Sequence, residues 1–395
     1  MEKVNKNRII LILGLLSAIG PFSIDMYLPG FPAIAKNLHA SIDQVAYSLS
    51  SFFFGVCIGQ LICGPLLDRF GRRPVLMVGM VIYILASFGC SLASSVESLI
   101  LFRFVQALGG CVCMVAPGAV VRDVFPVQES AKIFSYLILI LSVSPILAPT
   151  VGGYITGNFH WSVVFWVLAA VTILMLFAVY KWLPESGHPD ASISLRPAAM
   201  MRGYREVLRQ KQFVIFAFAG SIAAASLFSY IAGSPFVFMT LYGVSEQHYG
   251  WIFSLIAAGL ISASQVNNLL LKRRSSAQIL RRVIPFQSAV GVALVVGVAF
   301  HALGLYSMIT LLFLFLSCQG FTFPNAASLA MAPFDKGAGS ASALMGALQM
   351  AFGALCSFLV GIFFDGTALP MVVIMAVCSI ISSFILLRAK RKSGH

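Results

Sequence analysis

The stretch Gly64-Pro65-Leu66-Leu67-Asp68-Arg69-Phe70-Gly71-Arg72-Arg73-Pro74 decides how this chain folds. It is a short basic turn between two apolar runs, residues 44–67 and 74–95, each long enough to cross a bilayer, which takes about 20 residues. So short a connection brings the two runs side by side and antiparallel. The sequence therefore predicts a hairpin of membrane-spanning helices here.

Outward from this hairpin, the same apolar pattern continues along the whole chain. The predicted spans are residues 8–31, 44–67, 74–95, 98–121, 130–157, 161–183, 211–241, 248–271, 283–302, 304–331, 338–364 and 366–388. Of the 395 residues, 59% are hydrophobic and only 10% are charged, which leaves too few polar groups to cover a water-facing surface. We therefore expect an all-α membrane protein with twelve transmembrane helices.

One hydrophilic stretch divides the spans into two sets of six. We expect residues 1–183 and 211–395 to form two pseudo-symmetric six-helix bundles with a substrate site at their interface. Residues 184–210 are then a cytoplasmic linker, with a short amphipathic helix near residues 204–208.

The basic residues indicate the orientation in the membrane. The net charge is +13, and all Lys and Arg except Lys36 and Arg103 fall on one side of the predicted spans. By the positive-inside rule that side, with both termini, is cytoplasmic. The basic residues form no stripe with interleaved aromatics, so nucleic acid is not an expected partner. The eight cysteines lie in apolar segments without metal or disulfide spacing, and no cofactor or metal site is predicted.

Asp25 and Arg103 are the conspicuous charges inside the spans. Counting along the helices places both in the outer half of the bilayer, so the two side chains can meet or share a polar network. A carboxyl group in a low-dielectric cavity favours its protonated form, and alternating exposure would let Asp25 carry a proton across. Two plainer interpretations stay open: Asp25 caps a helix broken at residues 29–32, and Arg103 snorkels outward.

The stretch 64–74 closely resembles the cytoplasmic loop motif of the major facilitator superfamily. Gly64 would allow close helix approach and Gly71 a tight turn. Asp68 would face the N-terminus of the span that follows Gly337-Ala338-Gly339. The resemblance implies a conformational latch made of Gly64, Asp68, Arg69, Gly71, Arg72 and Arg73, with Arg122 and Asp123 as partners. A plain positively charged turn is the alternative.

Residues 144–153, Ser-Pro-Ile-Leu-Ala-Pro-Thr-Val-Gly-Gly, resemble the antiporter motif of the drug:proton branch of that superfamily. Ala148 stands where a glycine is usual. Pro145 and Pro149 would bend the helix, while Gly152 and Gly153 allow close packing, so that the segment serves as a pivot between the bundles. Generic close packing is a serious alternative.

Residues 24–32, 103–106 and 229–237 are similar to the Bcr/CflA group of bacterial multidrug exporters. This resemblance implies roles for Asp25 and Arg103 in proton coupling and substrate binding. Polar and adaptable side chains within the spans are candidates for lining a central cavity, although each is equally able to link helices. These candidates are Met26, Tyr27, Gln106, Tyr230, Phe236, Gln265, Gln319 and Gln349.

The expected function is a monomeric, proton-coupled antiporter that exports bicyclomycin- or chloramphenicol-like amphipathic compounds across the bacterial inner membrane. The alternative is proton-coupled transport of one physiological solute such as a dipeptide, amino acid or siderophore. An enzyme is not expected: there is no His-Glu-x-x-His pattern and no buried Ser or Cys beside a His, so no catalytic residue is proposed. A channel is disfavoured because the sequence shows no recognisable selectivity filter of charged side chains or backbone carbonyls.

Overall fold

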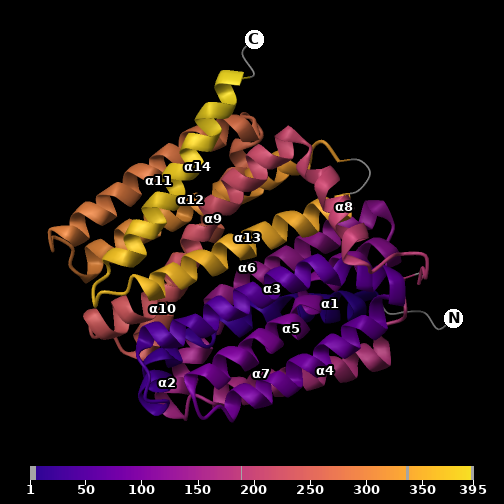
Figure 1. Cartoon of the computed structure of the whole chain (residues 1–395), viewed down its shortest axis with the longest axis horizontal. Helices are drawn as coiled ribbons and strands as arrows, with labels where there is room; N and C mark the ends of the chain where they lie inside the picture. The colour runs from indigo at the N-terminus through magenta and orange to yellow at the C-terminus, as the bar shows by residue number, and fades with distance from the viewer. Residues whose placement is uncertain (1–5, 188, 335–337, 393–395) are drawn as a thin grey trace.

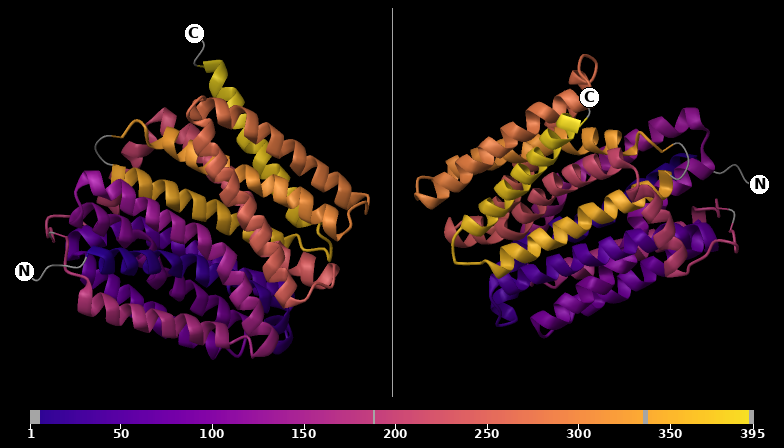
Figure 2. Two further views of the ribbon diagram at one scale, coloured as in Figure 1. Left: turned by 180° about the vertical axis from the view of Figure 1, so that it is seen from behind. Right: turned by 45° about the horizontal axis from the view of Figure 1, so that its top comes forward.

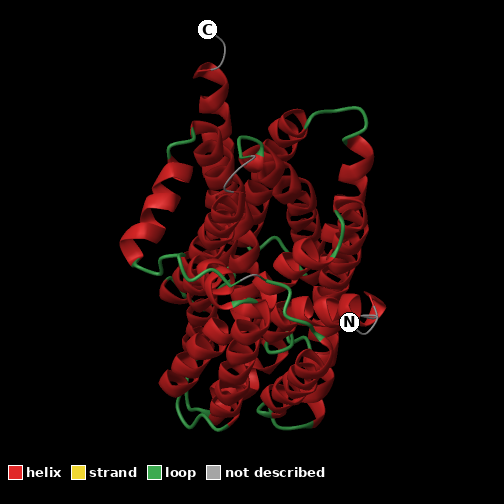
Figure 3. Ribbon diagram, turned by 90° about the vertical axis from the view of Figure 1, so that its right-hand side faces the viewer, coloured by secondary structure: helices red, strands yellow, loops and turns green. Residues whose placement is uncertain are grey.

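The chain forms a bundle of helices. The computed structural model describes residues 6–187, 189–334 and 338–392, and within these no strand occurs (Figure 3). In the same residues, twelve helical segments are long and apolar enough to span a membrane, which confirms the predicted fold class. The elements are α1 Lys6–Asp25, η1 Leu28–Gly30, α2 Phe31–Asn37, α3 Ile42–Phe70, α4 Arg72–Ser91, α5 Val96–Val124, α6 Val127–Asn158, α7 Val163–Trp182, α8 Pro197–Leu208, α9 Lys211–Pro235, η2 Phe236–Leu241, α10 Glu246–Leu270, α11 Ser276–Ala299, α12 Leu305–Met331, α13 Ala338–Ile362 and α14 Leu369–Lys392.

Local sequence signals set several helix ends. Ser41, Ser95 and Ser275 begin α3, α5 and α11 with capping boxes, in which the serine and the residue three positions later exchange hydrogen bonds. Gly71 alone separates α3 from α4 and has a φ of 94°, a conformation that side-chain-bearing residues rarely adopt. The tight turn predicted at this position is therefore present.

The first span of each set loses regular α geometry at one end. α1 ends at Asp25, and the span continues through the 3₁₀ turn η1 into α2. α9 ends at Pro235 and continues as the π-helical η2, which contacts α2. We call the end of the molecule formed by η1, α2, η2 and the first turn of α10 the Asp25 end. In Figure 1 the labels α2 and α10 mark it at the lower left, and both termini lie away from it.

Two groups of helices lie against each other. Figure 1 shows the first six spans as the lower, indigo-to-magenta group and the last six as the upper, salmon-to-yellow group, and Figure 2 gives two further views. The groups meet mainly where α3 packs on α13 and α6 packs on α10. The Oγ atoms of Ser50 and Ser357 lie 2.7 Å apart across the first contact. The division at residues 183 and 211 stays a prediction.

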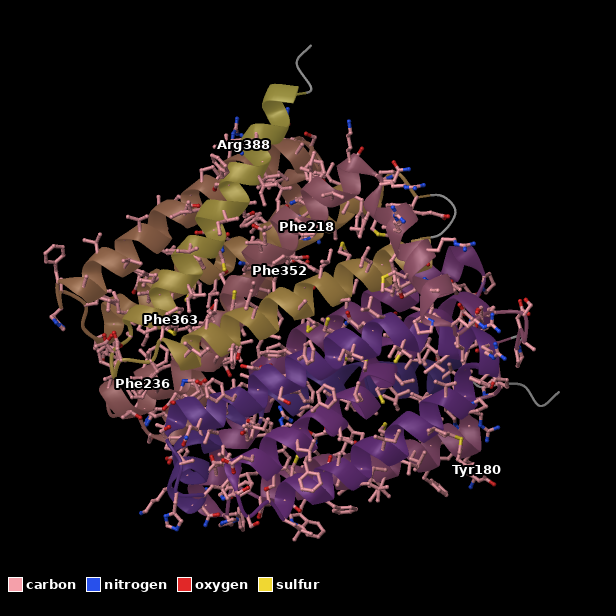
Figure 4. The ribbon with its side chains drawn as sticks, viewed as in Figure 1. Tyr180, Phe218, Phe236, Phe352, Phe363 and Arg388 are labelled. Carbon is pink, nitrogen blue, oxygen red and sulfur yellow. The ribbon has the colours of Figure 1, made fainter. Side chains whose placement is uncertain are left out.

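Aromatic rings fill part of the interface and of the second group. The ring centroids of Phe53 on α3 and Phe228 on α9 are 4.6 Å apart. Phe218 and Phe352, labelled in Figure 4, join α9 to α13 with centroids 5.8 Å apart. These contacts place α9 and α13 of the second group directly beside α3 of the first.

The linker contains the amphipathic helix α8, which is longer than the predicted segment. Its apolar side chains Tyr204 and Val207 are buried against the bundle, and burial raises the pKa of Tyr204. The Tyr204 hydroxyl donates to the Leu61 carbonyl of α3 at 2.7 Å, while α8 also contacts α9 and α13. The helix therefore touches both groups.

All eight cysteines are free and buried, as the interpretation of small hydrophobic side chains requires. The described residues contain no cluster of His, Cys, Asp and Glu side chains with the arrangement of a metal site.

Candidate functional site

Asp25 lies where the two groups of helices meet. It is the last residue of α1 and only 5% exposed. The following turn, η1, contacts α6 of the first group and α9 and α10 of the second. The C-terminal end of a helix carries partial negative charge, which adds to the cost of an ionised carboxylate away from water. Asp25 therefore lies just before a turn that contacts both groups of helices.

Arg103 is fully buried inside the first group and does not snorkel. Its guanidinium lies 4.2 Å from the ring centroid of Phe52 and 4.8 Å from that of Tyr27. Its Nη1 donates to Oε1 of Gln106 at 2.6 Å, and Gln106 donates in turn to Ser87 at 2.7 Å. Among the described atoms, Nε and Nη2 of Arg103 have no hydrogen-bond partner. The arginine is thus a cation held by aromatic faces and one amide.

Asp25 and Arg103 do not meet in this structure. Within the described part of the chain, no ion pair or hydrogen bond joins them. The contacts of Arg103 are Gln106 and the rings of Tyr27, Phe52 and Phe165. The Arg103 guanidinium lies among rings that include Phe52 on α3 and Phe165 on α7, whereas the turn after Asp25 contacts α9 and α10. The expectation of a shared polar network is wrong for this conformation.

Two predicted lining residues of the first span are packed within the first group. Tyr27 is 1% exposed, and its hydroxyl pairs with the Ser48 hydroxyl at 2.6 Å. Met26 is equally buried, with its backbone carbonyl against Gly152 of α6. In this state their contacts are those of helix packing, and a role in substrate binding stays a prediction.

The predicted lining residues of the second group are scattered. Gln319 donates to the Ala223 carbonyl at 2.6 Å and to Ser226 at 2.9 Å, so it links α12 to α9. Phe236 packs on Phe364 with centroids 4.5 Å apart and lines a small crevice beside α3 at the Asp25 end (Figure 4). Tyr230 is buried, Gln349 is half-buried and Gln265 is exposed.

The loop between α3 and α4 contains a network of charges. Arg72 binds the Asp68 carboxylate one turn earlier, and its Nε donates to Oδ2 of Asp123 on α5 at 2.8 Å. Arg69 donates to the Ile193 carbonyl, and Arg73 donates to the Tyr180 carbonyl of α7. The structure therefore brings most of the predicted latch residues together.

Glu185 is a member of this network that the sequence did not reveal. Its two carboxylate oxygens accept the backbone N–H groups of Arg72 at 2.8 Å and Arg73 at 3.0 Å, and so cap the N-terminus of α4. The Asp190 amide donates to the Asp68 carbonyl at 3.1 Å, and hydrogen bonds from Ser192 lower the pKa of the Asp190 carboxyl. The start of the linker is thus bound to the α3–α4 loop.

Three expectations about the latch differ from the structure. Among the described residues, no atom lies within 4 Å of a Cβ built on Gly64, so the expected close approach of a helix is not seen there. The described partner of the Asp68 carboxylate is Arg72 rather than the N-terminus of α13, and Gly337 lies outside the described residues. Arg122 is exposed, although its neighbour Asp123 binds Arg72.

The proline- and glycine-containing segment of α6 forms a close seam with the helices around it. Pro145 and Pro149 lie within the helix. A built Cβ on Gly152 would collide with the Met26 backbone, and one on Gly153 would meet the Glu246 backbone of α10. Close packing is therefore present here, both within the first group and between the groups, while the role of a pivot stays a prediction.

The fold is that of membrane transporters. A bacterial homolog to the human lysosomal transporter Spinster, in an inward-facing and unoccupied conformation, superimposes with a TM-score of 0.78 at 14% identity, covering 99% of this chain and 98% of that one. A D-xylose-proton symporter gives a TM-score of 0.73 at 14% identity, covering 96% and 97%.

The chain belongs to the Major Facilitator Superfamily, whose family model matches residues 13–360. It is 33% identical over 373 residues to the Bicyclomycin resistance protein homolog of Haemophilus influenzae, covering 94% of each chain. It is 31% identical over 371 residues to the Multidrug resistance protein MdtL of Escherichia coli, covering 93% of this chain and 92% of that protein. The resemblance inferred from the loop motif is confirmed.

Proposed function

We propose that this protein is a multidrug exporter that expels small amphipathic compounds in exchange for protons. Its relatives named for bicyclomycin and multidrug resistance support the substrate class. The observation that carries the coupling is Asp25, a carboxyl group 5% exposed where the two groups of helices meet. An acid in a membrane span is costly and usually marks an ion or proton path.

One proton supplies useful work in such an exchange. Its inward movement is worth about 2.3 kcal/mol per 100 mV of membrane potential and about 1.36 kcal/mol per unit of pH gradient. At a potential near 100 mV with one unit of pH gradient, the sum supports a drug ratio of several hundredfold, since each 1.4 kcal/mol is about a factor of ten.

The orientation follows from the charges. With both termini in the cytoplasm of a bacterium, the network around Arg72 lies at the inner face and the Asp25 end at the outer face. The likeness to an inward-facing structure then supports an inward-facing state for this one. Asp25 would release its proton inward before the drug is carried out. We propose a monomer in the inner membrane.

The test compares Asp25→Asn with the wild type in everted membrane vesicles energised by respiration. Chloramphenicol and a panel of amphipathic dyes serve as probes, each with and without an uncoupler. Uncoupler-sensitive accumulation that disappears in Asp25→Asn at equal membrane content supports the proposal. Unchanged accumulation by Asp25→Asn would refute the coupling role, and accumulation restricted to one physiological solute would favour a dedicated transporter.

A further inference from the structure

A cavity lies beside η2 at the Asp25 end, within the second group of helices. Its volume is about 420 Å³, which is in the range of small-molecule sites. Four segments line it: the end of η2, the end of α11 with the loop to α12, the start of α12, and the α13–α14 loop with the first residue of α14. We call this cavity the peripheral pocket, because neither Asp25 nor Arg103 lines it.

The peripheral pocket combines apolar walls with a polar rim. Val298, Met308 and Leu369 contribute apolar side chains that are buried or half-buried. His301 and Asp365 also line the pocket, and both residues are exposed. A ligand that matches this arrangement is amphipathic, with an apolar body and one polar group.

Hydrogen bonds hold the rim in place. Oδ1 of Asp365 accepts the Thr367 amide at 2.9 Å and the Thr367 hydroxyl at 2.7 Å. On the opposite side of the pocket, the Tyr242 hydroxyl donates to the Leu303 carbonyl at 3.0 Å and so joins the end of η2 to the α11–α12 loop. Within the described residues, Oδ2 of Asp365 takes part in no hydrogen bond or ion pair. One carboxylate oxygen of a preformed pocket is therefore free for a ligand.

The charges at this end of the molecule favour a cation as that ligand. Four acidic residues besides the buried Asp25 begin helices or lie in loops here: Asp43, Glu97, Glu246 and Asp365. Among the described Lys and Arg residues, Lys36 is the exposed one at this end, and the others apart from the buried Arg103 lie toward the opposite end. Such an excess of negative charge raises the local concentration of cations. Asp365 is the acid that lines the pocket itself.

We propose that the peripheral pocket is a second binding site, which takes a small amphipathic monocation. Its apolar body lies against Val298 and Met308, and its cationic group pairs with the Asp365 carboxylate. This inference deepens the proposed function, on which it rests for its role in export, by naming cationic amphiphiles among the substrates. In the proposed orientation the pocket is at the outer face, where it receives a compound released from between the two groups of helices. Binding itself requires no proton gradient.

The test uses ethidium monoazide, a photoreactive amphipathic monocation, with the purified protein. Illumination attaches the bound probe covalently, and mass spectrometry identifies the labelled peptides, which we expect to contain residues 297–308 and 365–369. Asp365→Asn should weaken the binding that leads to this labelling about fivefold at low salt, the factor that one unit charge supplies at contact distance in water. Glu97→Gln is the matched control, because it removes a charge from the same end but in the first group, at the start of α5.

Ala299→Trp is a second variant, which fills the pocket without changing its charge. Ala299 lines the pocket and is exposed, so the larger side chain needs no rearrangement of the bundle. Labelling of both segments should be lost in this variant.

Three results would overturn the assignment: labels confined to other segments, labelling of these segments that survives Ala299→Trp, or an affinity that Asp365→Asn leaves unchanged or lowers no more than Glu97→Gln does. The outcome is separable from that of the proposed function, because photolabelling needs no transport. Uncoupler-sensitive accumulation in vesicles without label in the pocket would remove only this site. A labelled pocket in a protein whose Asp25→Asn variant accumulates drug normally would keep the site and remove the proposed coupling.

Discussion

Adding one methyl group at Gly153 should push the protein out of the conformation seen here. Gly153 lies on α6 against the start of α10, in the other group of helices. A Cβ built there lies 2.5 Å from the Glu246 carbonyl oxygen, 3.1 Å from its carbon and 3.3 Å from the Gln247 Cα. These are backbone atoms, so no side-chain rotation relieves the clash. Gly153→Ala therefore forces α6 and α10 apart.

The magnitude follows from the cost of overpacking. An extra methyl group in a closely packed interior costs about 1–3 kcal/mol. If that cost is paid only while the Asp25 end is closed, the equilibrium between the two states shifts by about 5- to 150-fold. Gly157→Ala is the matched control on the same helix, since its Cβ would meet only the flexible Gln247 side chain at 3.5 Å.

The assay places nitroxide labels at Lys36 on α2 and Leu241 on η2, which are both exposed and lie in different groups. Pulsed electron spin resonance then measures the distance across the Asp25 end. Gly153→Ala should shift the distribution of label-to-label distances to longer values. Gly157→Ala should give the same distribution as the labelled protein that keeps both glycines. A distance distribution left unaltered by Gly153→Ala would refute the argument that this seam holds the end closed.

Two further predictions concern buried and capping charges. Arg103→Met should keep or raise the melting temperature while transport falls at least tenfold. A buried cation without a carboxylate costs several kcal/mol, which an apolar side chain of similar length avoids. A fall in both the melting temperature and transport would mark Arg103 as a structural residue. Glu185→Ala should lower the stability by about 1 kcal/mol by uncapping α4. Glu206→Ala, on exposed α8 surface, is its control in thermal melts, and equal melting curves for the two variants would contradict the capping role.

The sequence was sufficient for what depends on local pattern. Spans follow from apolar runs, because a bilayer demands about 20 such residues whatever surrounds them. The Gly71 turn was also predictable from the short loop. The resemblance to the loop motif implied Asp123 as a partner of the latch, and Asp123 binds Arg72. The position of Asp25 within the first span was likewise predictable from the local sequence.

What the sequence could not supply was direction and long-range pairing. Counting residues gave Asp25 and Arg103 similar depths, but depth along a helix does not say which neighbour a side chain faces. The cap that Glu185 places on α4 joins positions more than 110 residues apart with no local signal at either. Asp365 lay between two predicted spans, where nothing distinguished it from other loop residues.

The hydrogen bonds between the start of the linker and the α3–α4 loop shorten the free length of linker that joins the two groups. Glu185, Asp190 and Ile193 are each fastened to the first group by hydrogen bonds. The stretch from 184 to 193 would otherwise add roughly 33 Å of reach. If one group rocks against the other, the linker can accommodate the movement only after Ile193, where α8 contacts both groups.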